Sequence, residues 1–125
     1  MRREAPVQRA IVAYLRTALP NAVIHHARGE INKRGADIAR ELAQAKALGA
    51  VKGFPDLVVI LPAHLGVLFL EVKPEGGYAS DAQKAMHGKL ADLGYRVAIV
   101  RSIDDVRERL AAWGIWTRDR KAVAE

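Results

Sequence analysis

The chain has 125 residues, half of them hydrophobic, which predicts a single compact domain over 1–125 and leaves too little length for two. Without cysteine it forms no disulfide or thiolate site, and without an apolar span or a signal-peptide core we expect a soluble, cytoplasmic protein. The 20 Lys and Arg residues exceed the 14 Asp and Glu residues, and the resulting charge of +6 favours nucleic acid as a partner over a merely soluble basic surface.

The N-terminal part is predicted to contain two helices and one short strand. Pro6 suits a first helical turn, and Pro20 ends the helix that follows it. The segment 22–27 reads as a strand, 28–35 as a polar loop, and 36–48 as a peripheral helix with a thin apolar stripe. The first helix has a fuller apolar stripe, formed by Val7, Ile11, Tyr14, Leu15 and Ala18.

A β-hairpin is predicted after the break at Gly53-Phe54-Pro55. Its strands are 56–61 and 67–73, joined by a turn over 62–66. Both strands are apolar along most of their length, which is typical of central strands covered on two sides.

The remainder alternates helix, strand and helix. Ser80 begins a helix that ends at Gly94, and the spacing from Ser80 to Gln83 predicts a capping box. A strand over 95–101 and a helix over 103–113 follow, the latter behind a second capping-box pattern that starts at Ser102. The order α-β-(α)-β-β-α-β-α predicts an α/β fold with a mixed four-stranded sheet flanked by helices, a core over about 4–113, and a short C-terminal tail over 117–125.

The predicted hairpin brings two carboxylates together. If Leu61 faces Gly66 across the turn, Asp56 faces Glu71, and opposite side chains point to the same face of a sheet. Close carboxylates repel each other unless one is protonated or a cation lies between them, and an oxygen-rich site suits Mg²⁺ or Mn²⁺. Lys73 lies two residues beyond Glu71 and therefore on the same face.

These three residues match the needs of phosphodiester hydrolysis. Asp56 and Glu71 would hold a metal that orients water, and Lys73 would position that water or stabilise the growing negative charge on phosphorus. The alternative is an ion-pair cluster without metal. Against it, charged side chains at the end of two apolar strands cost desolvation free energy, so they are a poor means of adding stability alone.

Gly53-Phe54-Pro55-Asp56, then Glu71-Val72-Lys73, and then Gln83 resemble the PD-(D/E)XK nuclease superfamily, in particular its VRR-NUC (virus-type replication-repair nuclease) domains. The resemblance extends from the first helix to about Trp113. It implies a restriction-endonuclease-like core and a divalent-metal-dependent DNA endonuclease. The segment 28–51 departs from the family pattern, because it is longer than a minimal member needs.

The resemblance also assigns roles to individual residues. Asp56, Glu71 and Lys73 match the catalytic set, and the backbone carbonyl of Val72 would also reach the metal. Gln83 matches a helix glutamine near the site, with a capping-box role as the alternative. Glu4 matches a glutamate from the first helix near the metal, with interaction at a helix N-terminus as its alternative.

Contacts with DNA are expected at Arg28, Lys33, Arg34 and Lys52, which flank the Pro55-Asp56 corner, and at Tyr78, which could stack on an unpaired base. A solvated basic surface and a tyrosine that only braces the loop are the alternatives. A histidine ligand is not expected: His25 and His26 point to opposite faces of one strand, one of them packed or hydrogen-bonded in a structural role, and His64 lies in a turn. His87 shares a helix face with Gln83 and is the one histidine placed where it could approach substrate, but the sequence assigns it no role.

The expected activity is cleavage of branched, flapped or junction DNA by a homodimer, in phage or DNA-repair processing, as the resemblance implies. Two alternatives remain. A non-cleaving nucleic-acid-binding module would keep the fold without needing Asp56, Glu71 and Lys73. An RNA-directed nuclease would use the same metal site, because that site does not read the 2′-hydroxyl.

Overall fold

The computed structural model describes residues 4–27 and 36–119, including all side chains except those of 36–38. Its elements are α1 (Glu4–Ala18), β1 (Val23–His26), α2 (Ala36–Ala47), β2 (Leu57–Ile60), the short 3-10 helix η1 (Ala63–Leu65), β3 (Val67–Val72), α3 (Asp81–Asp92), β4 (Arg96–Val100) and α4 (Ile103–Ala112). The predicted order is confirmed, with the strand and helix ends shifted by one or two residues.

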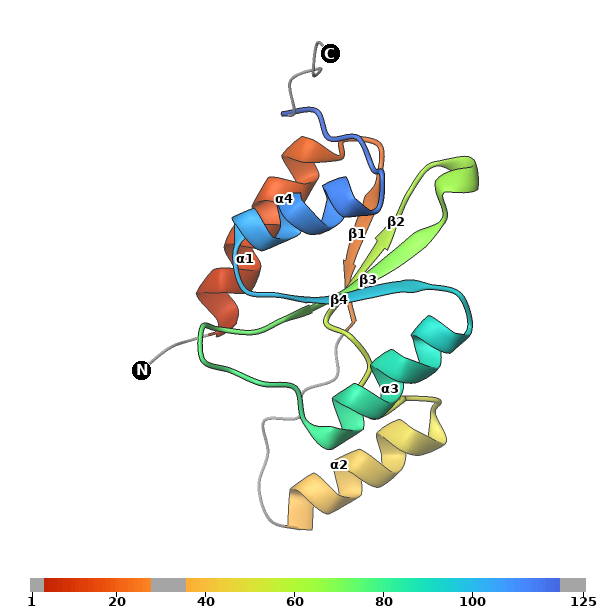
Figure 1. The fold of residues 1–125 in the computed structure, drawn as a ribbon. Helices are drawn as coiled ribbons and strands as arrows, with labels where there is room; N and C mark the ends of the chain where they lie inside the picture. Colours follow the sequence, from red (N-terminus) through yellow and green to blue (C-terminus); the bar gives the residue numbers. More distant parts are fainter. Residues whose placement is uncertain (1–3, 28–35, 120–125) are drawn as a thin grey trace.

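The four strands form one mixed sheet in the order β1-β2-β3-β4 (Figure 1). β1, β2 and β3 pair antiparallel, whereas β3 and β4 pair parallel. A parallel neighbour needs a long crossover, and α3 supplies it. The mixed α/β sheet predicted from the sequence is therefore confirmed.

The hydrophobic core fills the space between one face of the sheet and the pair α1 and α4, which lie side by side (Figure 1). Alternate residues of β3 point into it, so Leu68, Leu70 and Val72 are fully buried there. α1 contributes Ile11 and Leu15, as its apolar stripe predicts.

The opposite face of the sheet is covered by α3, which packs on β4 (Figure 1). An edge-to-face row of Phe54, Phe69 and Tyr95 lies on this side, with ring centroids 5.4 and 5.8 Å apart. Since Phe69 and Glu71 are two residues apart on β3, Glu71 projects to the same face as this row.

Packing continues beyond the predicted core limit near residue 113. Ile115 belongs to the core, Thr117 is buried, and the carboxylate of Asp119 accepts hydrogen bonds from Tyr14 and Arg107. The first part of the predicted tail is therefore attached to α1 and α4.

α2 is the peripheral helix that its thin apolar stripe predicts. It has no close backbone contact with another described helix or strand, and Figure 1 shows it apart from the sheet. Across 4–27 and 36–119, every helix is too short or too polar to cross a bilayer.

Candidate active site

The hairpin register places Asp56 beside Glu71. Leu57 pairs with Leu70, and Leu61 donates its N–H to the carbonyl of Gly66, so the register predicted from the turn is confirmed. Asp56 immediately precedes β2, and its Oδ2 accepts the backbone N–H of Val72 at 2.8 Å. This bond fixes the Asp56 carboxylate against the end of β3.

The carboxyl group of Glu71 lies at the centre of the site. Its side chain is 1% exposed, although its neighbours Leu70 and Val72 point into the apolar core on the other face of the sheet. Glu71 Oε2 accepts a hydrogen bond from Gln83 Nε2 at 3.1 Å and lies 3.6 Å from Lys73 Nζ. β3 and the first turn of α3 thus meet at one carboxylate.

Gln83 makes both of the contacts that the sequence left as alternatives. Its amide oxygen accepts the N–H of Ser80 at 2.9 Å, and Ser80 Oγ accepts the N–H of Gln83 at 3.1 Å, which completes the capping box. Its amide nitrogen remains available for Glu71. The bonds that begin α3 therefore also orient Gln83 toward the site.

Glu4 reaches the same place from the start of α1. Glu4, Asp56 and Glu71 each offer a carboxylate oxygen, and these three oxygens lie within 4.8 Å of one another. Lys73 lies beside this group, with its ammonium 3.6 Å from Glu71 Oε2. Carboxylates this close repel one another when ionised, which favours a cation or a proton among them.

The electrostatics of the site show in the pKa of Glu71. Burial and, after it, the adjacent Asp56 together raise the pKa of Glu71 from 4.5 to about 8, against the opposing effect of Lys73. A divalent cation would reverse this balance, since it favours the ionised carboxylate. All three donors are hard oxygens, so the residues present fit Mg²⁺ or Mn²⁺.

His87 approaches the site more closely than the sequence suggested. It lies one helical turn beyond Gln83, with Nε2 3.5 Å from Glu71 Oε1. Burial, followed by the nearby Lys73, lowers the pKa of His87. The spacing of four residues from Gln83 is the sequence signal for this placement, but it does not show that the imidazole is buried.

Gly53 sets the approach of the Pro55-Asp56 loop to α3. Its φ is +81°, and a Cβ at this position would lie 2.4 Å from the carbonyl oxygen of Ala82. Only glycine allows both the left-handed conformation and this backbone contact. The glycine that the resemblance includes therefore has a packing role next to Gln83.

The other predicted contacts lie farther out or outside the described residues. Lys52 is exposed, and Tyr78 is 80% exposed in the loop between β3 and α3. Arg28, Lys33 and Arg34 fall outside the described residues. The carbonyl of Val72 follows Glu71 on β3, and its role toward a metal stays a prediction.

The first strand holds no packed histidine, so of the two predicted structural roles only a hydrogen-bonded one stays a prediction. His25 and His26 are both exposed, because β1 is an edge strand and α1 covers only the side of Ile24. His64, in η1, is exposed as well. Among the described residues, none of these three histidines belongs to the group formed by Glu4, Asp56 and Glu71.

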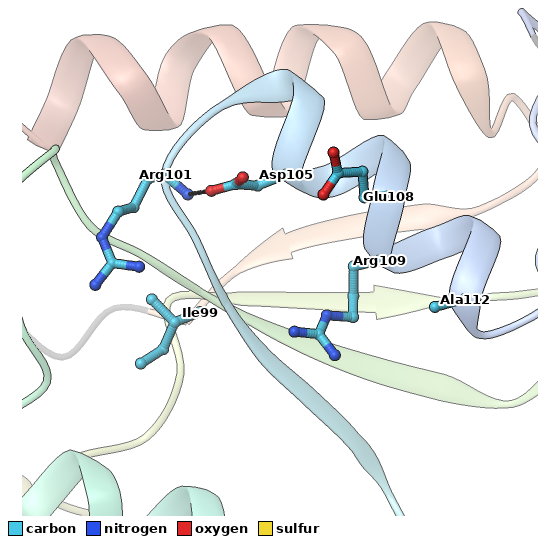
Figure 2. A pocket seen from close by; sticks show the side chains of 6 residues that line it. All are labelled: Ile99, Arg101, Asp105, Glu108, Arg109 and Ala112. Carbon is cyan, nitrogen blue, oxygen red and sulfur yellow. Dashed lines mark hydrogen bonds between the residues drawn. The ribbon is translucent and has the colours of Figure 1, made fainter.

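A hollow of about 390 Å³ lies at the sheet edge formed by β4 and at α4 (Figure 2). Arg101 and Arg109 line it together with Asp105 and Glu108, so its charges balance. None of the acidic-cluster residues contributes to it. Arg101 instead braces the loop next to the site, because its guanidinium donates to the carbonyl of Gly77 at 2.8 Å.

The chain matches one family of known proteins. The model of the VRR-NUC domain matches residues 6–104, which include every residue of the site except Glu4. A solved structure described as a VRR_NUC domain protein is 26% identical, with a TM-score of 0.66 over 88% of this chain and 86% of its own. Another, described as a VRR_NUC domain, is 24% identical and has a similar fold, with a TM-score of 0.58 over 87% of this chain and 94% of its own. No match was found among curated proteins.

Proposed function

This chain belongs to the VRR-NUC domain family, a nuclease-type family, and we propose that it is a divalent-metal-dependent nuclease that hydrolyses DNA. The observation that carries the proposal is the convergence of Glu4, Asp56 and Glu71 beside Lys73. Family membership supports the nuclease reaction, and the net charge of +6 supports a polyanionic substrate.

Each residue has a separate task in this proposal. Asp56 and Glu71 would hold Mg²⁺ or Mn²⁺, with Glu4 and the backbone carbonyl of Val72 as further ligands. When bound, the metal supplies a Lewis acid for a phosphate oxygen and lowers the pKa of a coordinated water. Gln83 orients the carboxylate of Glu71 through the 3.1 Å hydrogen bond.

Lys73 stands beside the acids, on the same face of β3. Water adds to phosphorus, one P–O ester bond breaks, and its oxygen leaves as the alcohol of one DNA end while the other end keeps the phosphate. The ammonium of Lys73 stabilises the negative charge that grows on the phosphoryl oxygens. Its side chain is 13% exposed, so water screens this interaction little.

The surroundings support a substrate with unpaired bases. Tyr78 presents its ring to solvent in the loop that follows Lys73, and Arg101 braces that loop through Gly77. A base that stacks on Tyr78 must be unpaired, as in flapped, branched or junction DNA. Lys52, with Arg28, Lys33 and Arg34, would neutralise phosphates. Such cleavage would serve DNA processing in replication or repair, phage DNA included, in the cytoplasm.

We also propose that the protein acts as a homodimer. Leu42, on α2, and Leu48, just after it, are exposed, and α2 has no close backbone contact with another described helix or strand. A second copy that covers them would remove apolar surface from water. Light scattering after size exclusion tests this, and a monomer at micromolar concentration would contradict it.

Cleavage of labelled DNA tests the main proposal. Linear, flapped and four-way DNA and an RNA duplex are each incubated with Mg²⁺, Mn²⁺ or EDTA. Wild type is compared with Asp56→Asn and Lys73→Ala, and with the matched surface variants Asp92→Asn and Lys89→Ala on α3. We expect cleavage of DNA only with metal, a loss of about 100-fold or more in both site variants, and little change in the controls.

Other outcomes would assign a different function. DNA binding by wild type without cleavage under any condition would identify a non-cleaving binding module. Preferential cleavage of the RNA duplex would identify an RNA-directed nuclease. Equal cleavage by wild type and Asp56→Asn would refute the assignment of the site.

A further inference from the structure

The two oxygens of Glu71 have different surroundings. Oε2 accepts a hydrogen bond from Gln83 at 3.1 Å and lies 3.6 Å from the ammonium of Lys73. Oε1 is buried and has no hydrogen-bond partner among the described residues. His87 faces this oxygen, with its Nε2 3.5 Å away.

His87 Nε2 is the complementary atom without a partner. It is also buried without a hydrogen bond within the described part of the chain, and the His87 side chain is only 14% exposed. A buried polar atom left without a partner lowers stability, and here two such atoms face each other. A leucine would fill the same space between α3 and the sheet without that penalty.

Gln83 and His87 are four residues apart, so α3 presents both to the sheet on one face. Gln83 lies against one oxygen of Glu71, and His87 lies against the other. A carboxylate held at a single oxygen still rotates about its last bond, whereas donors on both oxygens fix its plane. A fixed plane matters for a ligand that must meet a cation together with Glu4 and Asp56.

We propose that His87 is a positioning residue: it donates an N–H from Nε2 to Glu71 Oε1 and, with Gln83, orients this carboxylate for a divalent cation. A small rotation of the imidazole shortens the 3.5 Å separation to hydrogen-bond length. The inference rests on the proposed metal site, and it adds a determinant of cation affinity that touches neither the cation nor DNA.

Mn²⁺ binding to the metal-free protein tests the proposal without any cleavage assay. The electron paramagnetic resonance signal of free Mn²⁺ is titrated with wild type, with His87→Leu, which keeps volume but removes the donor, and with His87→Gln, which places an amide nitrogen near the position of Nε2. His64→Leu, in the exposed η1, is the matched control. Circular dichroism and thermal unfolding in EDTA report whether each variant folds.

We expect His87→Leu to weaken Mn²⁺ binding about 10-fold or more, as loss of a partner to a metal ligand does, and His87→Gln and His64→Leu to bind nearly as wild type does. If folded His87→Leu binds Mn²⁺ with wild-type affinity, this inference is overturned while the proposed function stands. The same holds if His87→Gln binds Mn²⁺ as weakly as His87→Leu does. If His87→Leu does not fold, His87→Ala takes its place. Weaker Mn²⁺ binding by His87→Ala than by wild type and His87→Gln supports the inference, and equal binding by all three overturns it. A wild type that does not bind Mn²⁺ would overturn both this inference and the proposed metal-dependent function.

Discussion

Replacing Glu71 with Gln should change how stability depends on pH in the metal-free protein. The pKa of Glu71 is raised from 4.5 to about 8, so the folded protein retains a proton that the unfolded chain releases. This stabilisation is fully present below pH 4.5 and is lost as pH rises toward 8. The interval from pH 5 to pH 7 lies between the pKa values of the unfolded and folded states. At about 1.4 kcal/mol per pH unit, the free energy of unfolding of the wild type falls by about 2–3 kcal/mol more over this interval than that of Glu71→Gln, which cannot ionise.

Urea unfolding in EDTA at both pH values measures this difference. The comparison uses the change with pH in each protein, so any fixed effect of the amide on Gln83 or Lys73 cancels. Glu108→Gln, an exposed substitution on α4, is the control and should follow the wild type. Parallel pH profiles for wild type and Glu71→Gln would refute the argument that burial and Asp56 hold a proton on Glu71. Mg²⁺ at pH 7 should restore stability to wild type and much less to the variant.

Three further changes follow from the same contacts. Gly53→Ala should lower the free energy of unfolding, measured in urea, by about 3 kcal/mol, because it combines positive φ with a backbone clash. Gly76→Ala, with positive φ and open space around the new Cβ, should lower it by only about 1 kcal/mol, and equal losses in the two variants would contradict this. Mg²⁺ at 100 times its Kd should stabilise wild type by about 2.7 kcal/mol in thermal unfolding but not Asp56→Asn, and an equal gain in both would place the metal elsewhere. Ser80→Ala removes the cap of α3 and should lower stability by about 1 kcal/mol, with weaker Mg²⁺ binding if the cap also orients Gln83; unchanged unfolding would show that the cap contributes little.

Local signals in the sequence predicted most of the fold. The capping box at Ser80 is present in full, because the side chains of residues 80 and 83 meet within one turn of any helix. The similar pattern at Ser102 is only half realised. Ser102 Oγ accepts the N–H of Asp105, but Asp105 Oδ2 accepts the N–H of Arg101 instead of completing the box. The spacing of Ser102 and Asp105 alone does not determine whether the carboxylate accepts the N–H of Ser102 or that of Arg101.

The burial of histidines depends on the tertiary structure. The sequence predicts that one of His25 and His26 is packed or hydrogen-bonded, yet both are exposed, because an edge strand with a helix on one side has too little cover. The sequence assigns no role to His87, yet this residue lies against Glu71. In both cases the local element is predicted correctly, whereas burial depends on which elements pack together.

The sequence by itself determined the meeting of Asp56 and Glu71, because a short turn sets the register of a hairpin and the register sets which side chains face each other. The strand period likewise put Lys73 on the face of Glu71. Only the tertiary structure decided that Glu4 arrives from α1, that α3 lies over this face of the sheet, and that His87 faces the second oxygen of Glu71. Those contacts join segments far apart in the chain, and they depend on the packing of helices on the sheet, which no local pattern of residues specifies.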